Sequence, residues 1–99
     1  MTSKAIILNE ADNVATALAD LAEDEVIEVQ VGLRVIAVRI AEPVPFGHKV
    51  ALVDIPADGS ILKYGESIGV ARRDIPAGGY VHVHNVESQR GRGDLPIQS

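Results

Sequence analysis

The feature that most constrains the fold of this chain is a series of short β-branched runs, each closed by Gly, Pro or charged residues. In one of them, residues 25–31, polar Glu28 and Gln30 alternate with Ile27 and Val29, as in a strand with one buried face. Short apolar runs at close intervals, separated by turn residues, are typical of a small all-β domain. We therefore expect a compact, mainly β fold, with strands in 4–8, 25–31, 34–40, 49–53, 60–64, 67–71 and 80–86.

One segment has a different period. In "NEADNVATALADLAED" the apolar residues Val14, Ala15, Leu18 and Leu21 fall at helical spacing, and Asp12 stands where an N-cap residue is expected. This pattern predicts one short helix near the N-terminus, at about 13–21.

A repeat lies within the β-rich region. "DIPADGSILK" begins at Asp54 and "DIPAGGYVHV" begins at Asp74, and a looser copy, "DLAEDEVIEV", begins at Asp20. Each copy has an acidic residue, an aliphatic residue, a tight turn and then a strand. Because so few copies cannot form a solenoid, we interpret them as turn-plus-strand corners of one folded sheet.

Composition excludes several classes of protein. Ninety-nine residues with 46% hydrophobic content are enough for one domain with its own core. The net charge of −5 argues against nucleic-acid binding. No apolar run has transmembrane length, and the start of the chain lacks the pattern of a signal peptide. With no cysteine to suggest an oxidising compartment, the cytoplasm is the expected location.

The three histidines are candidate site residues. His82 and His84 are two positions apart, so on a strand they would share a face about 6–7 Å apart at the Cα. His48, in the loop "VPFGHKV", offers a third imidazole for a metal or an anionic substrate. The alternative is a strand that shows two polar side chains to water. Asp54 and Asp74 are explained by their turns.

Two loops place cationic residues beside glycine. "PFGHK" brings Lys49 next to His48, and "KYGE" brings Lys63 next to Tyr64. Either loop has the groups to hold a carboxylate or a sulfonate. Either is also an ordinary turn between strands, with Tyr64 as a small-core aromatic.

Taken together and in this order, "DNVATAL", "PFGHKVAL", "KYGE", "VHVHN" and "RGRGDL" resemble the small domain of the altronate and galactarate dehydratase family. The sulfolactate sulfo-lyase small subunit is similar. The resemblance covers about residues 5–95 and implies a β-clip domain of the SAF type over 1–88. Residues 89–99 are then expected to be a flexible tail that contacts a partner subunit. The ending favours a separate small subunit over a piece of a longer enzyme.

The resemblance implies a lyase that eliminates water from a sugar acid and yields a 2-keto-3-deoxy acid. Iron(II) or another divalent metal would assist, held mainly by a large catalytic subunit that is the main partner. His48, His82 and His84 would be catalytic, with His82 and His84 also as metal ligands. Substrate-binding roles would fall to four further residues: Lys49, Lys63, Tyr64 and Asn85.

Two other functions stay open. One is sulfite elimination from sulfolactate, and the other is a non-catalytic SAF module that binds sugar acids or a partner protein. Free strand edges on a small β domain also leave room for a homo-oligomer.

Overall fold

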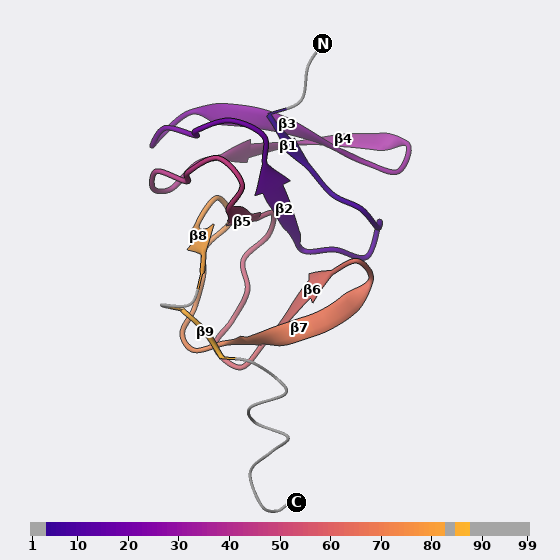
Figure 1. The fold of residues 1–99 in the computed structure, drawn as a ribbon, viewed down its shortest axis with the longest axis vertical. Coiled ribbons are helices and arrows are strands. Elements are labelled where there is room, and N and C mark those ends of the chain that lie inside the picture. The colour runs from indigo at the N-terminus through magenta and orange to yellow at the C-terminus, as the bar shows by residue number, and fades with distance from the viewer. Residues whose placement is uncertain (1–3, 83–84, 88–99) are drawn as a thin grey trace, which may run out of the picture.

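The computed structural model describes residues 4–82 and 85–87. All the regular elements in this part of the chain are strands (Figure 1). They are β1 (Ala5–Ile6), β2 (Val14–Ala17), β3 (Val26–Val31), β4 (Arg34–Arg39), β5 (Lys49–Ala51), β6 (Ser60–Lys63), β7 (Glu66–Ala71), β8 (Tyr80–Val81) and β9 (Val86–Glu87). The expected mainly β class is confirmed, and none of the described segments is a helix that could cross a membrane.

The strands form three antiparallel sheets. A four-stranded sheet has the order β1-β2-β5-β8, β3 pairs with β4, and a three-stranded sheet has the order β6-β7-β9. In Figure 1 the β3–β4 ribbon lies at the top beside β1, the other strands of the four-stranded sheet lie below it, and the β6-β7-β9 sheet lies at the bottom. The four-stranded sheet is therefore the middle layer.

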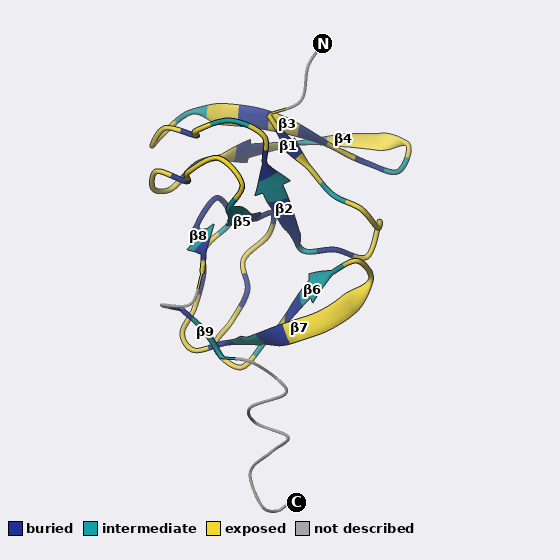
Figure 2. Ribbon diagram, in the orientation of Figure 1, coloured by how far each residue is buried: buried dark blue, intermediate teal, exposed yellow. Residues whose placement is uncertain are grey.

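Two groups of buried side chains fill the spaces on either side of this middle sheet. The first core cluster is Ala5, Ala15, Ala17, Leu21, Ile27, Val29, Val31, Val38, Ile40, Val44, Val50 and Leu52. The second core cluster is Val14, Ala51, Ile55, Ile61, Ala71, Ile75 and Val81. Exposed residues run along β4 and the outer half of β7 (Figure 2).

The helix predicted over 13–21 is wrong, since the segment contains β2. This strand pairs with β1 on one edge and β5 on the other, and it is buried on both faces. A strand that is buried on both faces does not alternate between polar and apolar residues. Its apolar residues can therefore fit the spacing of a helix as well as that of a strand. Asp12 does not cap a helix. Its carboxylate accepts the backbone N–H groups of Leu8 (3.3 Å), Asn9 (3.2 Å) and Gly65 (2.8 Å).

The single strand predicted over 80–86 is also corrected. β8 ends at Val81 and β9 begins at Val86. Asn85 lies outside both strands, and its backbone N–H donates to the carbonyl of His82 at 3.0 Å.

The two aspartate-led repeats form corners, as expected, and the structure shows in addition that the two corners bind each other. Ile55 and Ile75 exchange both backbone hydrogen bonds, each 2.8 Å long. The aspartate that opens each repeat accepts a backbone N–H from the other repeat, Asp54 from Ala77 (2.9 Å) and Asp74 from Ala57 (2.8 Å). The two copies thus hold each other in place.

The copy at Asp20 pairs in the same way with a fourth corner that the repeat analysis missed. Leu21 and Val44 exchange hydrogen bonds of 2.8 and 3.0 Å, and Asp20 accepts the N–H of Phe46 at 2.9 Å. The fourth corner ends at His48, whose N–H donates to the carbonyl of Pro45 at 3.0 Å. Gly59 and Gly79 make the matching bonds to Pro56 and Pro76. His48 thus occupies the corner position that Gly59 has in the Asp54 copy and Gly79 has in the Asp74 copy.

Candidate functional site

Two of the predicted histidines meet where β5 and β8 lie side by side. The antiparallel register pairs Lys49 with Val81 and Val50 with Tyr80. One residue beyond this ladder, His48 is therefore opposite His82. Their ring centroids are 4.8 Å apart, with the ring planes at 59°. Residues 34 positions apart in sequence thus present their imidazoles at one place.

Tyr80 completes this group, and the sequence analysis did not select it. Its hydroxyl oxygen lies 2.7 Å from Nδ1 of His48. Its ring is stacked on His82 at a centroid distance of 5.5 Å and an angle of 6°, and it lies edge-on to His48. Tyr80 precedes His82 by two positions, so extending the i, i+2 argument made for His82 and His84 would have included it. We call His48, Tyr80 and His82 the ring cluster.

The ring cluster is partly open to solvent. His82 is exposed, whereas His48 and Tyr80 are half-buried. Each imidazole can donate a hydrogen bond from one ring nitrogen and accept one at the other. The arrangement can therefore hold an anionic oxygen or move a proton.

Asn85 lies beneath the ring cluster and is 5% exposed. Its Oδ1 accepts the backbone N–H of His82 at 2.9 Å, and its Nδ2 donates to the carbonyl of Tyr80 at 2.7 Å. Both amide contacts go to main chain and fix the end of β8. Asn85 thereby orients the ring cluster, and a direct contact with substrate stays a prediction.

The other predicted residues lie elsewhere. Lys49 is the first residue of β5 and directly follows His48, so strand alternation turns its side chain toward the opposite face of the sheet. Lys63 and Tyr64 stand at the tip of the β6–β7 hairpin, with the Lys63 Nζ 3.9 Å from the Tyr64 ring centroid. In Figure 1 this tip and β8 are on opposite sides of the molecule. His84 lies outside the described residues.

A small hollow adjoins the ring cluster. It has a volume of about 230 Å³ and is lined by Glu42, Arg73, Asp74, Ile75, Pro76 and Asn85. Glu42 also accepts the backbone N–H of Tyr80 at 3.2 Å. One guanidinium and two carboxylates thus line the space beside β8.

The side chains that could bind a divalent metal ion here are imidazoles and carboxylates. Within residues 4–82 and 85–87, no group of three or more His, Cys, Asp or Glu side chains is placed to hold a metal ion. The ring cluster offers two imidazoles, and Nδ1 of His48 already contacts Tyr80. The described residues therefore do not form a metal site by themselves.

The chain is similar in sequence to a domain of known dehydratases. A family model described as the altronate/galactarate dehydratase SAF domain matches residues 3–89. The chain is 46% identical over 83 residues to altronate dehydratase of Escherichia coli (strain K12), and 43% identical over 76 residues to galactarate dehydratase (L-threo-forming) of the same organism. These matches cover 84% and 77% of this chain but 16% and 14% of the two enzymes.

A third relative is much shorter. The (2R)-sulfolactate sulfo-lyase subunit alpha of Chromohalobacter salexigens is 37% identical over 57 residues, which is 58% of this chain and 61% of that subunit. The chain thus spans about one-sixth of the two dehydratases and about three-fifths of the sulfo-lyase subunit.

Proposed function

Because this chain belongs to the altronate/galactarate dehydratase SAF domain family, we propose that it serves as the small subunit of a lyase acting on a sugar acid. The enzyme would eliminate water from an altronate- or galactarate-type substrate and release a 2-keto-3-deoxy acid. A larger catalytic polypeptide would supply most of the active site, since the dehydratase relatives are about six times longer than the matched segment. With no cysteine in the chain, the cytoplasm stays our proposed location.

The observation that carries this proposal is the ring cluster at the open end of the β5–β8 pair. In an elimination next to a carboxylate, negative charge develops on the substrate's oxygens as the proton leaves. Positioned imidazole N–H groups stabilise such charge best when they are fixed before the reaction. His48 is fixed by its corner and by Tyr80, and exposed His82 is open to a ligand.

The remaining predicted residues would act only in a composite site. Lys49, Lys63 and Tyr64 point away from the ring cluster or lie across the molecule from it. We propose that any contact they make with substrate occurs where the larger polypeptide covers them. His84 is kept as a catalytic candidate on the sequence motif alone.

Iron(II), or another divalent metal, is our proposed cofactor, held mainly by the larger polypeptide. Bound there, it would act as a Lewis acid on the substrate's oxygens. Among the described residues two imidazoles do not complete a ligand set, so we assign His48 and His82 to hydrogen bonding and proton transfer. The metal-ligand role predicted for His82 with His84 stays a prediction.

The test is to isolate the tagged chain with its larger partner and assay 2-keto acid formation from altronate and galactarate with iron(II) present. His48→Ala and His82→Ala should each lower kcat/KM by about 10²-fold, the usual effect of removing one stabilising donor. Leu33→Ala, at a fully exposed loop residue, is the matched control. A larger partner that is fully active with both histidine variants would refute the proposed role of the ring cluster.

A second candidate is the sulfo-lyase reaction, favoured by the 61% coverage of the sulfo-lyase alpha subunit. The carbon–sulfur bond of sulfolactate would break and sulfite would leave in place of water. Sulfite release by the same isolated complex identifies this alternative. A complex that binds these acids without turning any over would instead indicate a non-catalytic SAF module.

A further inference from the structure

The contact between Tyr80 and His48 bears on which role His48 can take. The phenolic oxygen is 2.7 Å from Nδ1, within the range of a good hydrogen bond. A phenol O–H is a strong donor, and an unprotonated imidazole nitrogen is a strong acceptor. We infer that Tyr80 donates to Nδ1 of His48 and thereby holds the neutral ring with its proton on Nε2.

Both partners of this hydrogen bond are fixed by main-chain contacts. His48 donates its N–H to Pro45 at 3.0 Å, and its carbonyl accepts the N–H of Ala17 at 2.8 Å. The carbonyl of Tyr80 accepts from Asn85 at 2.7 Å, and the Tyr80 ring is stacked on His82 at 6°. The two backbones are therefore held in place, and the stack on His82 restricts the orientation of the Tyr80 ring.

The consequence rests on the proposed function. A neutral imidazole whose Nδ1 accepts from Tyr80 offers its other nitrogen only as an N–H donor. His48 would therefore bind a carboxylate or enolate oxygen, and the base that removes the substrate's proton is another group. Tyr80 is then a positioning residue, which nothing in the sequence motifs had selected.

The tautomer can be measured on the full chain without any substrate. Nitrogen-15 spectra of the histidine rings would be recorded about two pH units above the usual imidazole pKa of about 6.5. We expect a pyridine-type signal for Nδ1 of His48 and a pyrrole-type signal for Nε2, assigned with His48→Gln and His82→Gln. Tyr80→Phe keeps the ring and removes the hydroxyl, so it should shift His48 toward the mixed tautomers of a free imidazole. A proton on Nδ1 of His48, or an unchanged His48 spectrum in Tyr80→Phe, would overturn the inference.

The role in catalysis is tested in the complex with the larger polypeptide. Tyr80→Phe should lower kcat about three- to tenfold with little change in KM, because it disturbs the direction of a donor. Tyr80→Leu also removes the stack on His82 and should lower activity further. Wild-type kcat in Tyr80→Phe, together with an altered tautomer, would overturn the donor role of His48. A complex with no lyase activity at all would count against the proposed function and leave the tautomer result standing.

Discussion

Asn85 is a buried amide that binds the main chain of two members of the ring cluster, His82 through its oxygen and Tyr80 through its nitrogen. Asn85→Ala removes both hydrogen bonds and leaves the part-buried N–H of His82 and carbonyl of Tyr80 without these partners. We expect the free energy of unfolding to fall by about 1–3 kcal/mol, measured by urea denaturation. Asn9→Ala, which removes one exposed side-chain contact to the Ala11 N–H, is the control and should cost less. Unchanged stability with lost substrate binding would instead identify Asn85 as a substrate ligand.

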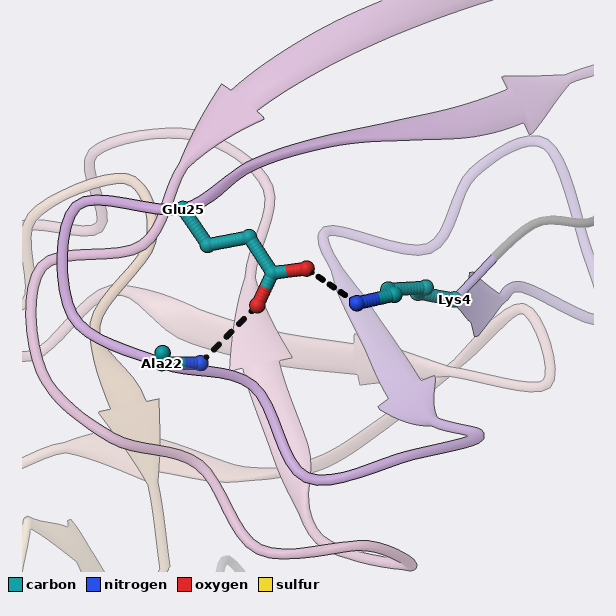
Figure 3. Close-up of polar contacts among 3 residues, drawn as sticks. All are labelled: Lys4, Ala22 and Glu25. Atoms are coloured by element: carbon teal, nitrogen blue, oxygen red, sulfur yellow. Dashed lines mark hydrogen bonds and ion pairs between the residues drawn. The ribbon is translucent and has the colours of Figure 1, made fainter.

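Glu25 gives the fold a dependence on pH. Its carboxylate accepts from the Lys4 ammonium and from the Ala22 N–H (Figure 3). The hydrogen bond from Lys4 and then that from Ala22 lower the pKa of Glu25 below its ordinary value of 4.5, against a smaller opposing effect of desolvation. A lowered folded-state pKa stabilises the fold above 4.5, and this contribution is lost as the pH falls through the folded-state pKa.

The stability difference between wild type and Glu25→Gln should therefore shrink as the pH is lowered from neutral to below 4.5. Urea denaturation at a series of pH values measures it. Lys4→Gln removes the largest cause of the lowered Glu25 pKa. This variant should therefore also show a weaker pH dependence of the free energy of unfolding than wild type. If Lys4→Gln keeps the wild-type dependence, Lys4 is not the cause.

At the scale of elements, two glycines in equivalent corners have the same backbone angle but different surroundings. Gly78 and Gly47 both have φ of +84°. A Cβ on Gly78 would lie 1.8 Å from the carbonyl oxygen of Arg39, whereas a Cβ on Gly47 would meet nothing within 4 Å. Gly47→Ala should therefore cost only the backbone strain, about 1–2 kcal/mol.

Gly78→Ala adds a clash with main chain to the same strain, so it should cost more than about 3 kcal/mol or prevent folding. Circular dichroism and urea denaturation of the two variants make the comparison. Equal losses would mean that the Gly78 corner can move away from Arg39.

The tip of the β6–β7 hairpin carries a residue that its geometry does not favour. Tyr64 and Gly65 have φ of +58° and +75°, as in a type I′ turn, where Asn-Gly is preferred. Tyr64 is also 58% exposed. Tyr64→Asn should therefore raise the free energy of unfolding by about 0.5–1 kcal/mol, because Asn tolerates this conformation better. Urea denaturation tests this. A destabilised variant would show that the contact with Lys63 outweighs the strain.

The same elements show where sequence patterns sufficed and where they did not. The alternation in 25–31 predicted β3 because one face of that ribbon is exposed. β2 was mistaken for a helix because pairing on both edges and burial on both faces leave no period-2 signal. The break between β8 and β9 depends on the side chain of Asn85, whose turn-forming contacts are not visible in a β-branched run.

In the complete fold, the ring cluster depends on strand pairing between distant segments, which local sequence patterns do not show. His48 and His82 were selected singly, but their meeting requires the β5–β8 pairing. The corner that ends at His48 has the same aliphatic–Pro–turn pattern as the Asp54 copy. It lacks the opening aspartate, so the repeat was not recognised in the sequence. Lys63 and Tyr64 were grouped with the histidines by motif order alone, and the fold separates them.

The two core clusters lie on opposite faces of one sheet, so they should unfold together. Adjacent residues of β2 and of β5 belong to different clusters. Ala15 and Val50 pack in the first cluster, and Val14 and Ala51 pack in the second. Loss of either cluster therefore removes support from the same two strands. Unfolding in urea should be a single transition for probes in both clusters.

Ile40 and Ile61 provide a matched test, because each is 0% exposed and they belong to different clusters. Ile40→Ala and Ile61→Ala should each cost about 2–5 kcal/mol, a large share of the stability of a small domain. Methyl signals of Val29 in the first cluster and Ala71 in the second should shift to the same lower midpoint in both variants. Leu33→Ala, at a fully exposed residue, should leave both midpoints in place. If Ile61→Ala lowered the Ala71 midpoint and spared that of Val29, the clusters would be separate folding units, and the four-stranded sheet would not couple them.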